Sequence, residues 1–412
     1  MQLSRRSAIS IGIVVLLGIF VFLGRWYETR QATPTLASDG IMIDVTDGAD
    51  RGPGTLREAL FIAASASSEV TITIRARKIV ITTALPPLVN MRGIRLAVAE
   101  AGTEIDASGL TSGPVLDVAG ANVSIEGLII RNCAAAAILL RSEQFRLQSA
   151  TIETCDVGVD VAETASQVLI EGNRFAKNRI GVRFAGTNRN TSVVGNEFTE
   201  HGDAGIWAVR SEPDSRGEAI TIRDNRFSNE RVGIVAGNVA VLAETNELLE
   251  MEEAAIQLIG ANAVVRGNRV RGGKVMGIVA ENAQAAVIDS NELDGLAAYG
   301  IMVKGSADTL VRGNRIHNSG YGMAFVLART PSTAVDNTII EPKFNGIDVV
   351  GDSPVLRNNS VLRPRALALK VIDYEPADGE RVRSEPFLEG NNFNRDGQVI
   401  AASRGTETAP PP

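Results

Sequence analysis

An asparagine recurs along most of this chain at a nearly constant spacing. It stands at positions 173, 196, 225, 246, 268, 291, 314, 337 and 359, which gives intervals of 23, 29, 21, 22, 23, 23, 23 and 22 residues. A fixed period of this size is typical of a solenoid, in which each repeat forms one coil and packs on its two neighbours. The repeat therefore limits the possible folds more than any other feature of the sequence.

The segments between the asparagines indicate β-strands. Apolar residues flank most of the asparagines, and a further segment in each coil reads IGVRF, AGIWA, VGIVA, MGIVA, YGIMV, YGMAF or NGIDV. Apolar residues alternate with polar or small ones over short stretches, whereas helical repeats need longer stretches with a 3.6-residue period. We expect an all-β parallel β-helix with about 23 residues and three strands per coil, in which neighbouring strands lie about 4.8 Å apart.

The residue that follows each asparagine alternates in charge. This series is Arg174, Glu197, Arg226, Glu247, Arg269, Glu292 and Arg315. Stacked coils place each member beside the next, where opposite charges contribute about 0.2–1 kcal/mol and like charges are unfavourable. We interpret the series as a structural charge ladder.

Two intervals are longer than the repeat. The 29-residue interval contains six additional residues, SEPDSR at 211–216, and the 32 residues between Asn359 and Asn391 contain nine, DYEPADGER at 373–381. Each insertion follows the GI-type segment of its coil, so both loops should leave the solenoid along one edge, about 34 Å apart. They would bracket a trough on that face.

Cys133 and Cys155 are the only cysteines, and they occupy nearly the same position in adjacent coils. In an oxidising compartment such a pair can form a disulfide. Stacked inward thiols are the alternative, which we favour from the sequence. The cysteines lack zinc-ligand spacing, and no metal site is predicted.

Residues 40–69 should close the N-terminal end of the solenoid, whose first strand would otherwise expose an unpaired edge. Thr55 and Glu58 form a Thr-x-x-Glu capping box, and four apolar residues lie on one helical face: Leu56, Ala59, Leu60 and Ala63. We expect a strand and an amphipathic capping helix here. The β-helix should cover residues 70–402, and 403–412 should form a disordered, proline-rich tail.

The N-terminus resembles a membrane anchor. Arg5 and Arg6 precede an apolar run that spans about 25 Å as a helix, and no small-x-small cleavage site directly follows it. We expect residues 1–7 to be cytoplasmic, 8–24 to form a transmembrane signal anchor and 25–39 to form a tether, with a cleavable signal peptide as the alternative. Basic residues before the run place the β-helix on the periplasmic or extracellular side of the cytoplasmic membrane.

Several motifs carry a family resemblance over about residues 40–400: the capping helix, the strands VTITI and KIVIT, the phrase LPPL, the segments EIDASGL and VLDVAGANVSIEGLIIRN, and the stacked GN turns. In these features the chain resembles the right-handed parallel β-helix proteins of the pectate-lyase-like superfamily. That superfamily includes polysaccharide lyases, glycoside hydrolases, mannuronan epimerases, phage tailspikes and adhesins, so the resemblance implies a fold and does not select an activity. The chain lacks a WIDH-type lyase motif, the paired aspartates of polygalacturonases and the DPHD of the epimerases.

The resemblance implies a site on the outer face of one strand stack, and the GI-type segments have the most variable outward residues. Their first outward row reads Asp160, Arg183, Trp207, Val235, Gln257, Val279, Met302, Ala324 and Asp348, and the next row includes Glu281, Lys304 and Lys370. We expect Asp348 and Lys370 to be diagonal neighbours.

Candidate site residues come from these two rows. Glu281, Lys304 and Asp348 are the candidate catalytic residues, because lyases and epimerases of uronic acids need a base and a cation. Arg183, Trp207, Gln257 and Lys370 are the candidate substrate-binding residues, with Trp207 able to stack on a sugar ring. Glu281 and Lys304 are 23 residues apart, so a purely structural ion pair is their alternative. His201 and His317 fall in turns, where we expect solvated side chains.

The sequence predicts a membrane-anchored extracytoplasmic β-helix protein that binds or modifies a bacterial polysaccharide, with lyase- or epimerase-like chemistry as one form of that function. A non-catalytic scaffold or adhesin is the alternative. The expected partners are the cytoplasmic membrane and a polysaccharide. A net charge of −7 with scattered Lys and Arg argues against nucleic acid as a partner. The sequence indicates no particular cofactor and leaves enzymatic activity open.

Overall fold

A computed structural model describes residues 40–186, 188–212, 219–376, 380–395, 398–399 and 403–407. The anchor and the tether that the sequence predicts over residues 1–39 lie outside these described residues. Within the described part, none of the helices combines the length and the apolar character that crossing a membrane requires. All elements below belong to the unit that begins at Ile41.

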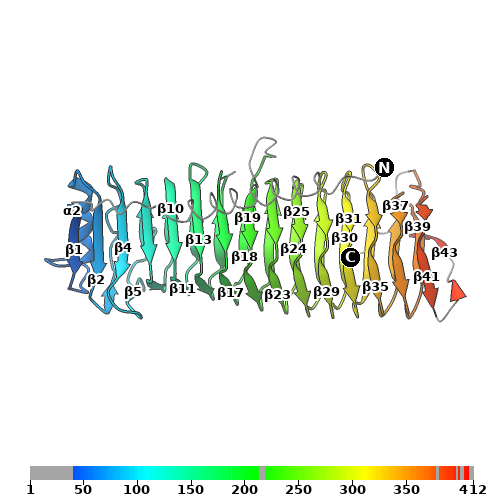
Figure 1. Cartoon of the computed structure of the whole chain (residues 1–412), viewed down its shortest axis with the longest axis horizontal. Coiled ribbons are helices and arrows are strands. Elements are labelled where there is room, and N and C mark those ends of the chain that lie inside the picture. The colour runs from blue at the N-terminus through cyan, green and yellow to red at the C-terminus, as the bar shows by residue number, and fades with distance from the viewer. Residues whose placement is uncertain are drawn as a thin grey trace, which may run out of the picture. The chain divides into compact units, whose positions relative to one another are not determined.

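The described strands form three sheets, and neighbouring strands of a sheet belong to successive coils (Figure 1). Sheet 1 consists of β1 (Ile41–Val45), β2 (Val70–Ile74), β4 (Ile94–Val98), β7 (Val123–Glu126), β10 (Glu143–Gln148), β13 (Ser166–Glu171), β16 (Ser192–Val194), β19 (Ile220–Arg223), β22 (Val241–Glu244), β25 (Ala263–Arg266), β28 (Val287–Asp289), β31 (Leu310–Arg312), β34 (Thr333–Val335), β37 (Val355–Arg357) and β40 (Phe387–Glu389).

Sheet 2 contains the residues that follow the repeated asparagines. It consists of β3 (Lys78–Val80), β5 (Glu104–Asp106), β8 (Ile129–Arg131), β11 (Thr151–Glu153), β14 (Arg174–Ala176), β17 (Glu197–Thr199), β20 (Arg226–Ser228), β23 (Glu247–Leu249), β26 (Arg269–Arg271), β29 (Glu292–Asp294), β32 (Arg315–His317), β35 (Thr338–Ile340), β38 (Ser360–Leu362), β41 (Asn392–Arg395) and β42 (Gln398–Val399). Strand β42 pairs antiparallel with β41, whereas the other strand pairs are parallel.

Sheet 3 contains the GI-type segments. It consists of β6 (Leu116–Val118), β9 (Ala136–Leu140), β12 (Val157–Val161), β15 (Ile180–Phe184), β18 (Ala204–Val209), β21 (Val232–Gly237), β24 (Ala254–Ile259), β27 (Met276–Glu281), β30 (Tyr299–Lys304), β33 (Tyr321–Val326), β36 (Ile347–Val350), β39 (Leu369–Tyr374) and β43 (Ser403–Glu407). The predicted three-stranded coil of about 23 residues is therefore confirmed. Strand β43, which pairs with β39, lies where the sequence predicted a disordered tail.

The repeated asparagines form one continuous ladder between sheets 1 and 2. The side-chain Nδ2 of Asn173 donates to Oδ1 of Asn196 at 3.0 Å, and the same bond recurs at every step as far as Asn391. Each Nδ2 also donates to a backbone carbonyl of the preceding coil, for example from Asn268 to Ala243 at 3.0 Å. The asparagines are buried, so the ladder satisfies polar groups that a single coil leaves without partners.

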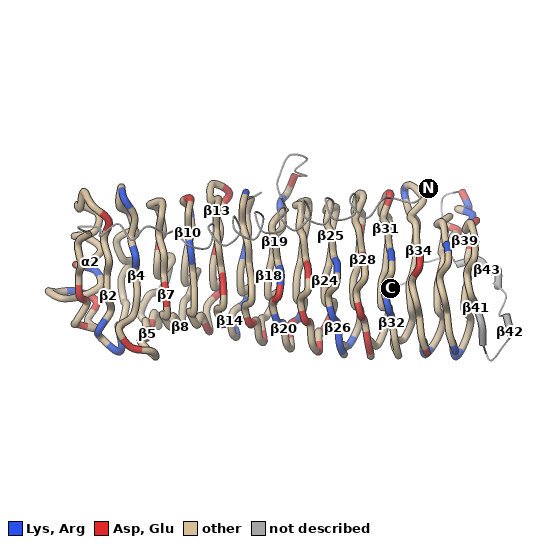
Figure 2. The backbone as a smooth tube through the Cα atoms, in the orientation of Figure 1, with Lys and Arg blue, Asp and Glu red and all other residues tan. Residues whose placement is uncertain are grey.

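The charge ladder has the predicted register. Arg174 pairs with Glu197 across neighbouring strands, and their side chains form an ion pair of 2.8 Å. Further ion pairs join Arg226 to Glu247 and Arg269 to Glu292. Basic and acidic residues alternate along the coils, as Figure 2 shows.

Inward side chains from the three sheets fill the core. The isoleucines of the GI-type segments are fully buried, and Phe175, Phe198 and Phe227 stack in successive coils with ring centroids 5.0 and 4.8 Å apart. In most GI-type segments a glycine precedes the inward residue and lies close to this core. A Cβ atom on Gly322 would lie 2.3 Å from the carbonyl oxygen of Gly346, which favours glycine there, while Ala255 takes the equivalent position in β24.

The helix α2 (Leu56–Ser65) follows β1 and covers the first coil. Its four buried residues are the four that the sequence places on one face: Leu56, Ala59, Leu60 and Ala63. The hydroxyl of Thr55 accepts a bond from the backbone N–H of Glu58, as in a capping box. The carboxylate of Glu58 accepts from the N–H of Gly54 rather than from that of Thr55.

The two insertions leave the same edge, as predicted. The first follows β18 and the second overlaps the end of β39, so both lie where the chain passes from sheet 3 to sheet 1. Residues 213–218 and 377–379 of these loops lie outside the described residues. In the second loop, Asp373 and Tyr374 extend β39, and Tyr374 forms an antiparallel bridge with Val382.

Two expectations about single residues were wrong. Cys133 and Cys155 are buried and bonded to each other, with their Cα atoms 4.3 Å apart, so they are not separate thiols. His201 is not solvated but 3% exposed, because its Nδ1 lies 2.8 Å from the carboxylate of the buried Glu230. The other histidine, His317, is the last residue of β32 rather than part of a turn; it is partly buried, and its Nδ1 lies 3.0 Å from Oδ1 of Asp294.

Candidate functional site

The outer face of sheet 3 carries the predicted first outward row in full. Residues of successive strands pair in the order Asp160, Arg183, Trp207, Val235, Gln257, Val279, Met302, Ala324, Asp348 and Lys370. The prediction that Asp348 and Lys370 are diagonal neighbours was therefore wrong, because Lys370 belongs to the same row and lies directly beside Asp348. The cause is the 22-residue spacing between them, one residue shorter than the common repeat.

Much of this outward row is apolar and buried. Val235, Val279, Met302 and Ala324 are each 1–6% exposed although they point away from the core. They belong to two hydrophobic clusters that are separate from the core, one around Trp207 and one around Met302. Rows on either side are also apolar, so neighbouring side chains cover one another. We had expected these residues to be exposed, and their burial leaves few polar groups on the central part of this face.

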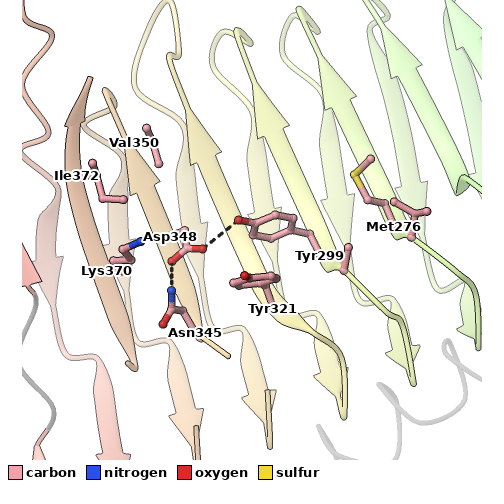
Figure 3. A pocket seen from close by; sticks show the side chains of 10 residues that line it. Met276, Tyr299, Tyr321, Asn345, Asp348, Val350, Lys370 and Ile372 are labelled. Carbon is pink, nitrogen blue, oxygen red and sulfur yellow. Dashed lines mark hydrogen bonds between the residues drawn. The ribbon is translucent and has the colours of Figure 1, made fainter. Parts of the chain in front are cut away.

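A cavity of about 320 Å³ opens in this face over the C-terminal strands. Its wall comes from β27, β30, β33, β36 and β39 and from the turns that precede them. The lining residues are Val275, Met276, Ala298, Tyr299, Tyr321, Asn345, Asp348, Val350, Lys370 and Ile372. Figure 3 shows Asp348 between the two tyrosines on one side and Lys370 on the other.

Aromatic rings form one wall of the cavity. Tyr299, Tyr321 and Phe344 follow one another in adjacent coils, with ring centroids 4.6 and 4.9 Å apart and interplanar angles of 22° and 26°. Tyr299 and Tyr321 are register partners in β30 and β33, whereas Phe344 lies in the turn before β36 and does not line the cavity. Phe344 is 50% exposed, whereas the two tyrosines are partly buried.

The carboxylate of Asp348 is the central polar group. It is 5% exposed, and it accepts bonds from the hydroxyl of Tyr299 at 3.0 Å and from Nδ2 of Asn345 at 2.8 Å. Tyr299 lies two coils from Asp348 and three residues before Met302, the member of the outward row in its own strand. Asn345 is itself held, since its Oδ1 accepts from the N–H of Leu367 at 3.2 Å. These contacts fix the carboxylate in one orientation.

Two other polar groups face the cavity without such contacts. No hydrogen bond or ion pair joins the ammonium of Lys370 to another described side chain, although Asp348 is its neighbour in the row. The hydroxyl of Tyr321 likewise forms no hydrogen bond within the described residues. A cation and a hydroxyl are thus available to a ligand beside a fixed carboxylate.

The other candidate residues lie outside this cavity. Glu281 and Lys304 are neighbours, as predicted, and their side chains form an ion pair with an Nζ–Oε1 distance of 3.8 Å. Arg183 forms two hydrogen bonds with Asp160, which raise the pKa of its guanidinium. Trp207 packs on the first apolar cluster, and Gln257 lies between Val235 and Val279 in the row. Of the seven candidates, only Asp348 and Lys370 line one cavity.

Sequence reasoning missed Tyr299, Tyr321 and Asn345. A signal for them exists in the segments YGIMV, YGMAF and NGIDV, in which the position before the glycine is occupied by tyrosine twice and then by asparagine. That position is occupied by smaller or aliphatic residues in the earlier coils, so the change marks these coils as different. Among the described residues, no group of three or more His, Cys, Asp or Glu side chains is placed to hold a metal ion.

The cavity suits a small ring-shaped ligand that has both polar groups and an apolar face. Ligand cavities typically combine apolar walls with a few fixed polar groups, as this one does. Hydrolysis of a glycosidic bond usually requires two carboxylic acids about 5–10 Å apart, whereas Asp348 is the only acid among the described lining residues. Proton transfer at a carbon atom needs only one base and a nearby positive charge, and this cavity contains both.

Comparison with known proteins supports the fold. A family model described as "Right handed beta helix region" matches residues 96–216 and 214–361, which together make up more than half of the chain. No curated protein sequence matches the chain.

Several solved structures are similar in fold. They include the catalytic unit of a GH87 alpha-1,3-glucanase from Streptomyces thermodiastaticus, with 15% identity, a TM-score of 0.50 and coverage of 92% of this chain and 72% of the other. The A-module of the mannuronan C-5 epimerase AlgE4 from Azotobacter vinelandii has 12% identity, a TM-score of 0.51 and coverage of 88% and 100%. PfbA, a surface adhesin of Streptococcus pneumoniae, has 12% identity, a TM-score of 0.52 and coverage of 89% and 100%. Identities this low establish a shared fold alone.

Proposed function

The chain belongs to the right-handed β-helix family and has its pectate-lyase-like architecture, and from this premise we propose that it binds a bacterial polysaccharide in the cavity over β30, β33, β36 and β39. The observation that carries the proposal is one cavity that combines stacked tyrosines, the fixed carboxylate of Asp348 and the unpaired ammonium of Lys370. Sugar rings present apolar C–H groups and hydroxyls together, so they match such a lining. The glucanase and the epimerase that share the fold act on polysaccharides, which is consistent with this proposal.

Lyase- or epimerase-like chemistry is the catalytic form of the proposal. Asp348 would remove the proton on the carbon beside the carboxylate of a uronic acid, and Lys370 would stabilise the negative charge that develops there. The electron pair would then form a carbon–carbon double bond as the glycosidic bond breaks and the leaving sugar oxygen takes a proton from the hydroxyl of Tyr321, or the carbon would instead take a proton from water on the opposite face. Both outcomes use residues of the one cavity.

A non-catalytic scaffold or adhesin is the second candidate. Its support is the pairing of charges elsewhere on the outer face of sheet 3, where Asp160 binds Arg183 and Glu281 binds Lys304. Opposite charges in neighbouring coils stabilise the stack, and their pairing occupies these four side chains. The adhesin that shares the fold is an example of this class.

We also propose that the β-helix is held at the outer side of the cytoplasmic membrane by residues 8–24. The support is the apolar run with preceding arginines in the sequence, together with the disulfide between Cys133 and Cys155. Disulfides persist in oxidising compartments outside the cytoplasm, so the bond agrees with export of the β-helix. Resistance of the full chain to extraction from membranes by alkaline carbonate would support the anchor, and release would contradict it.

The function is tested by measuring binding of the full chain, purified in detergent, to a panel of uronic-acid and neutral glycans. We expect one class to bind, and Lys370→Ala or Tyr321→Ala to weaken its affinity by about tenfold, equivalent to about 1.4 kcal/mol. Lys304→Ala is the matched control, because Lys304 lies on the same face outside the cavity, and it should change affinity by less than about twofold.

The same panel separates the alternatives. Unsaturated product, detected by its ultraviolet absorbance, or an epimerised sugar, detected by NMR, supports catalysis, and Asp348→Asn should abolish it. Binding without product supports the adhesin or scaffold. If Lys304→Ala weakens binding and Lys370→Ala does not, the proposed site is wrong, and binding to no member of the panel contradicts the glycan proposal.

A further inference from the structure

The exposed large hydrophobic side chains are concentrated at the N-terminal end of the solenoid. Eleven such residues occur in the described part of the chain, and seven of them precede residue 92: Ile41, Met42, Phe61, Ile62, Val80, Val89 and Met91. The most exposed are Met91 at 94%, Met42 at 77% and Phe61 at 62%. Single exposed hydrophobic residues are common on proteins, whereas a concentration in one place indicates an interaction surface.

The capping helix contributes two of these residues on its outer side. Its buried face packs on the first coil, while Phe61 and Ile62 lie away from that face and are 62% and 42% exposed. The terminal cap of a solenoid normally has a polar outer face, because that face must remain in water. A helix with apolar residues on both sides is usually covered on both sides. The outer side of α2 therefore differs from the polar outer face that is expected of a cap in contact with water.

Met91 lies in a turn at the C-terminal end of α2. The preceding residue, Asn90, is 6% exposed and donates from Nδ2 to the carbonyl oxygens of Ala63 at 2.8 Å and Ala66 at 3.0 Å. Its Oδ1 accepts from the backbone N–H of Arg92 at 2.7 Å, which fixes the turn that carries Met91. The turn is thus held against the last turn of α2. We call Phe61, Ile62 and Met91 the apolar cap surface.

We propose that the apolar cap surface rests in the interface of a lipid bilayer, so that the first coil faces the membrane. The 40 residues that precede β1 join the solenoid at this end, because β1 begins at Ile41. They include the apolar run at 8–23, and the tether at 25–39 could reach at most about 50 Å when fully extended. If the apolar run is in a membrane, the tether attaches the described unit to that membrane at its first strand, β1.

The charges of this region are compatible with an anionic lipid surface. Residues 41–100 contain seven Arg and Lys and six Asp and Glu, so their net charge is +1, whereas the whole chain has −7. The guanidinium of Arg92, next to Met91, forms no ion pair with a described residue. Apolar residues interleaved with arginines are typical of surfaces that enter the headgroup region by about 5–10 Å.

The inference goes beyond glycan binding and depends on the proposed anchor for its orientation. It is tested with the full chain in liposomes of phosphatidylcholine and phosphatidylglycerol that contain a headgroup nitroxide lipid. A fluorescent dye is attached to Ile62→Cys or, as the matched control, to Leu388→Cys, an exposed apolar position of similar exposure (48%) at the other end of the solenoid. The two native cysteines are bonded to each other and should not react with the dye.

We expect the dye at position 62 to lose about half of its emission or more, and the dye at 388 to lose less than about a tenth. Adding Phe61→Glu and Met91→Glu should reduce the quenching at 62 at least about twofold, while Phe387→Glu should leave it unchanged. Thermal melting checks that these outward substitutions leave the fold intact. Equal quenching at both positions, or none at 62 in liposome-bound chain, overturns the proposal.

Two further experimental outcomes would lead to different conclusions. A dimer in detergent that Phe61→Glu dissociates, together with no quenching at 62, would assign the apolar cap surface to a second copy of the chain and overturn the lipid contact. Carbonate extraction of the chain would contradict the anchor alone. In that case, quenching at 62 after vesicles are added to the extracted chain would still support the cap contact, and its absence would overturn it.

Discussion

Asp352 is a carboxyl group that is buried just after β36. It is 4% exposed, and its oxygens accept bonds from the backbone N–H groups of Ser353 at 2.6 Å and Ala328 at 3.2 Å. It forms no ion pair with a described residue, and the loss of hydration raises its pKa from 3.8 to about 6. Burial disfavours the charged form, so the folded state holds its proton at pH values where the unfolded chain has lost it.

This shift predicts a pH dependence of stability with a definite sign. Between about pH 4 and pH 6 the folded state binds more protons, so the free energy of unfolding falls as the pH rises, by on the order of 2–3 kcal/mol in total. The destabilisation that the buried charge of Asp352 causes is absent below about pH 4 and complete above about pH 6. Asp352→Asn removes the titration, so the Tm of the variant minus that of the wild type should rise by about 2–4 °C between pH 4 and pH 7.5.

Asp156 supplies a control of opposite sign. Its hydrogen bonds with Arg179 lower the pKa of its carboxyl group, so it stabilises the fold at neutral pH and loses this effect on acidification. Asp156→Asn should therefore become relatively less stable as the pH rises. A Tm difference for Asp352→Asn that stays constant from pH 4 to pH 7.5 would contradict the assignment.

The asparagine ladder is the element that joins coil to coil. Oδ1 of Asn268 accepts from the backbone N–H of Asn246 at 3.0 Å and from its Nδ2 at 2.9 Å, while Nδ2 of Asn268 donates to the carbonyl of Ala243. Asn268→Ala would leave these buried groups without partners, at a cost of about 2–4 kcal/mol. Urea unfolding followed by circular dichroism should show the loss as a lower midpoint.

The next residue provides the control for this substitution. Arg269 is about half exposed and pairs with Glu292, and exposed ion pairs contribute at most about 1 kcal/mol. Arg269→Ala should therefore shift the urea midpoint much less than Asn268→Ala does. Equal shifts would mean that the buried amide ladder has no special role in stability.

The strands could be predicted from the sequence because the repeat determines the register. A period near 23 makes Arg174 and Glu197 neighbours whatever the details of the turns, and the same counting gives the row from Asp160 to Asp348. Counting also shows that Cys133 and Cys155 are adjacent, but adjacency is the same for two thiols and for a disulfide. The sequence pattern therefore could not distinguish these two states.

The cavity could be predicted only in part, because its contacts cross more than one coil. The row gave Asp348, yet the hydrogen bond from Tyr299 joins residues that are two coils apart and in different rows. Nearest-neighbour counting contains no such information. Alternation also failed to predict the burial of Val235 and Met302, since both faces of sheet 3 are apolar there and inward and outward residues have the same character.

Closure of the N-terminal end matters to the whole molecule. Leu60 is 1% exposed and holds α2 on the first coil, whose strand β1 has no further neighbour in sheet 1. Leu60→Asp should release the helix and expose this edge, which would then pair with other copies of the chain. Light scattering in detergent should show soluble oligomers that grow with concentration. Phe61→Asp, on the outer side of the same helix, should remain the size of the wild type, and oligomers of both variants alike would argue against this role of Leu60.

The constant rise of the coils gives the cavity a defined height. Nine steps of sheet 1 separate β1 from β25, the strand in the coil where the cavity begins, and at about 4.8 Å each they place it roughly 43 Å from the first coil. If the apolar cap surface rests on a membrane, the cavity lies at a fixed distance from that membrane. It can then bind only those polymer strands that pass at this distance. Deleting one complete coil from the middle of the solenoid would bring the cavity closer to the first coil by one strand spacing and leave the residues that line it unchanged.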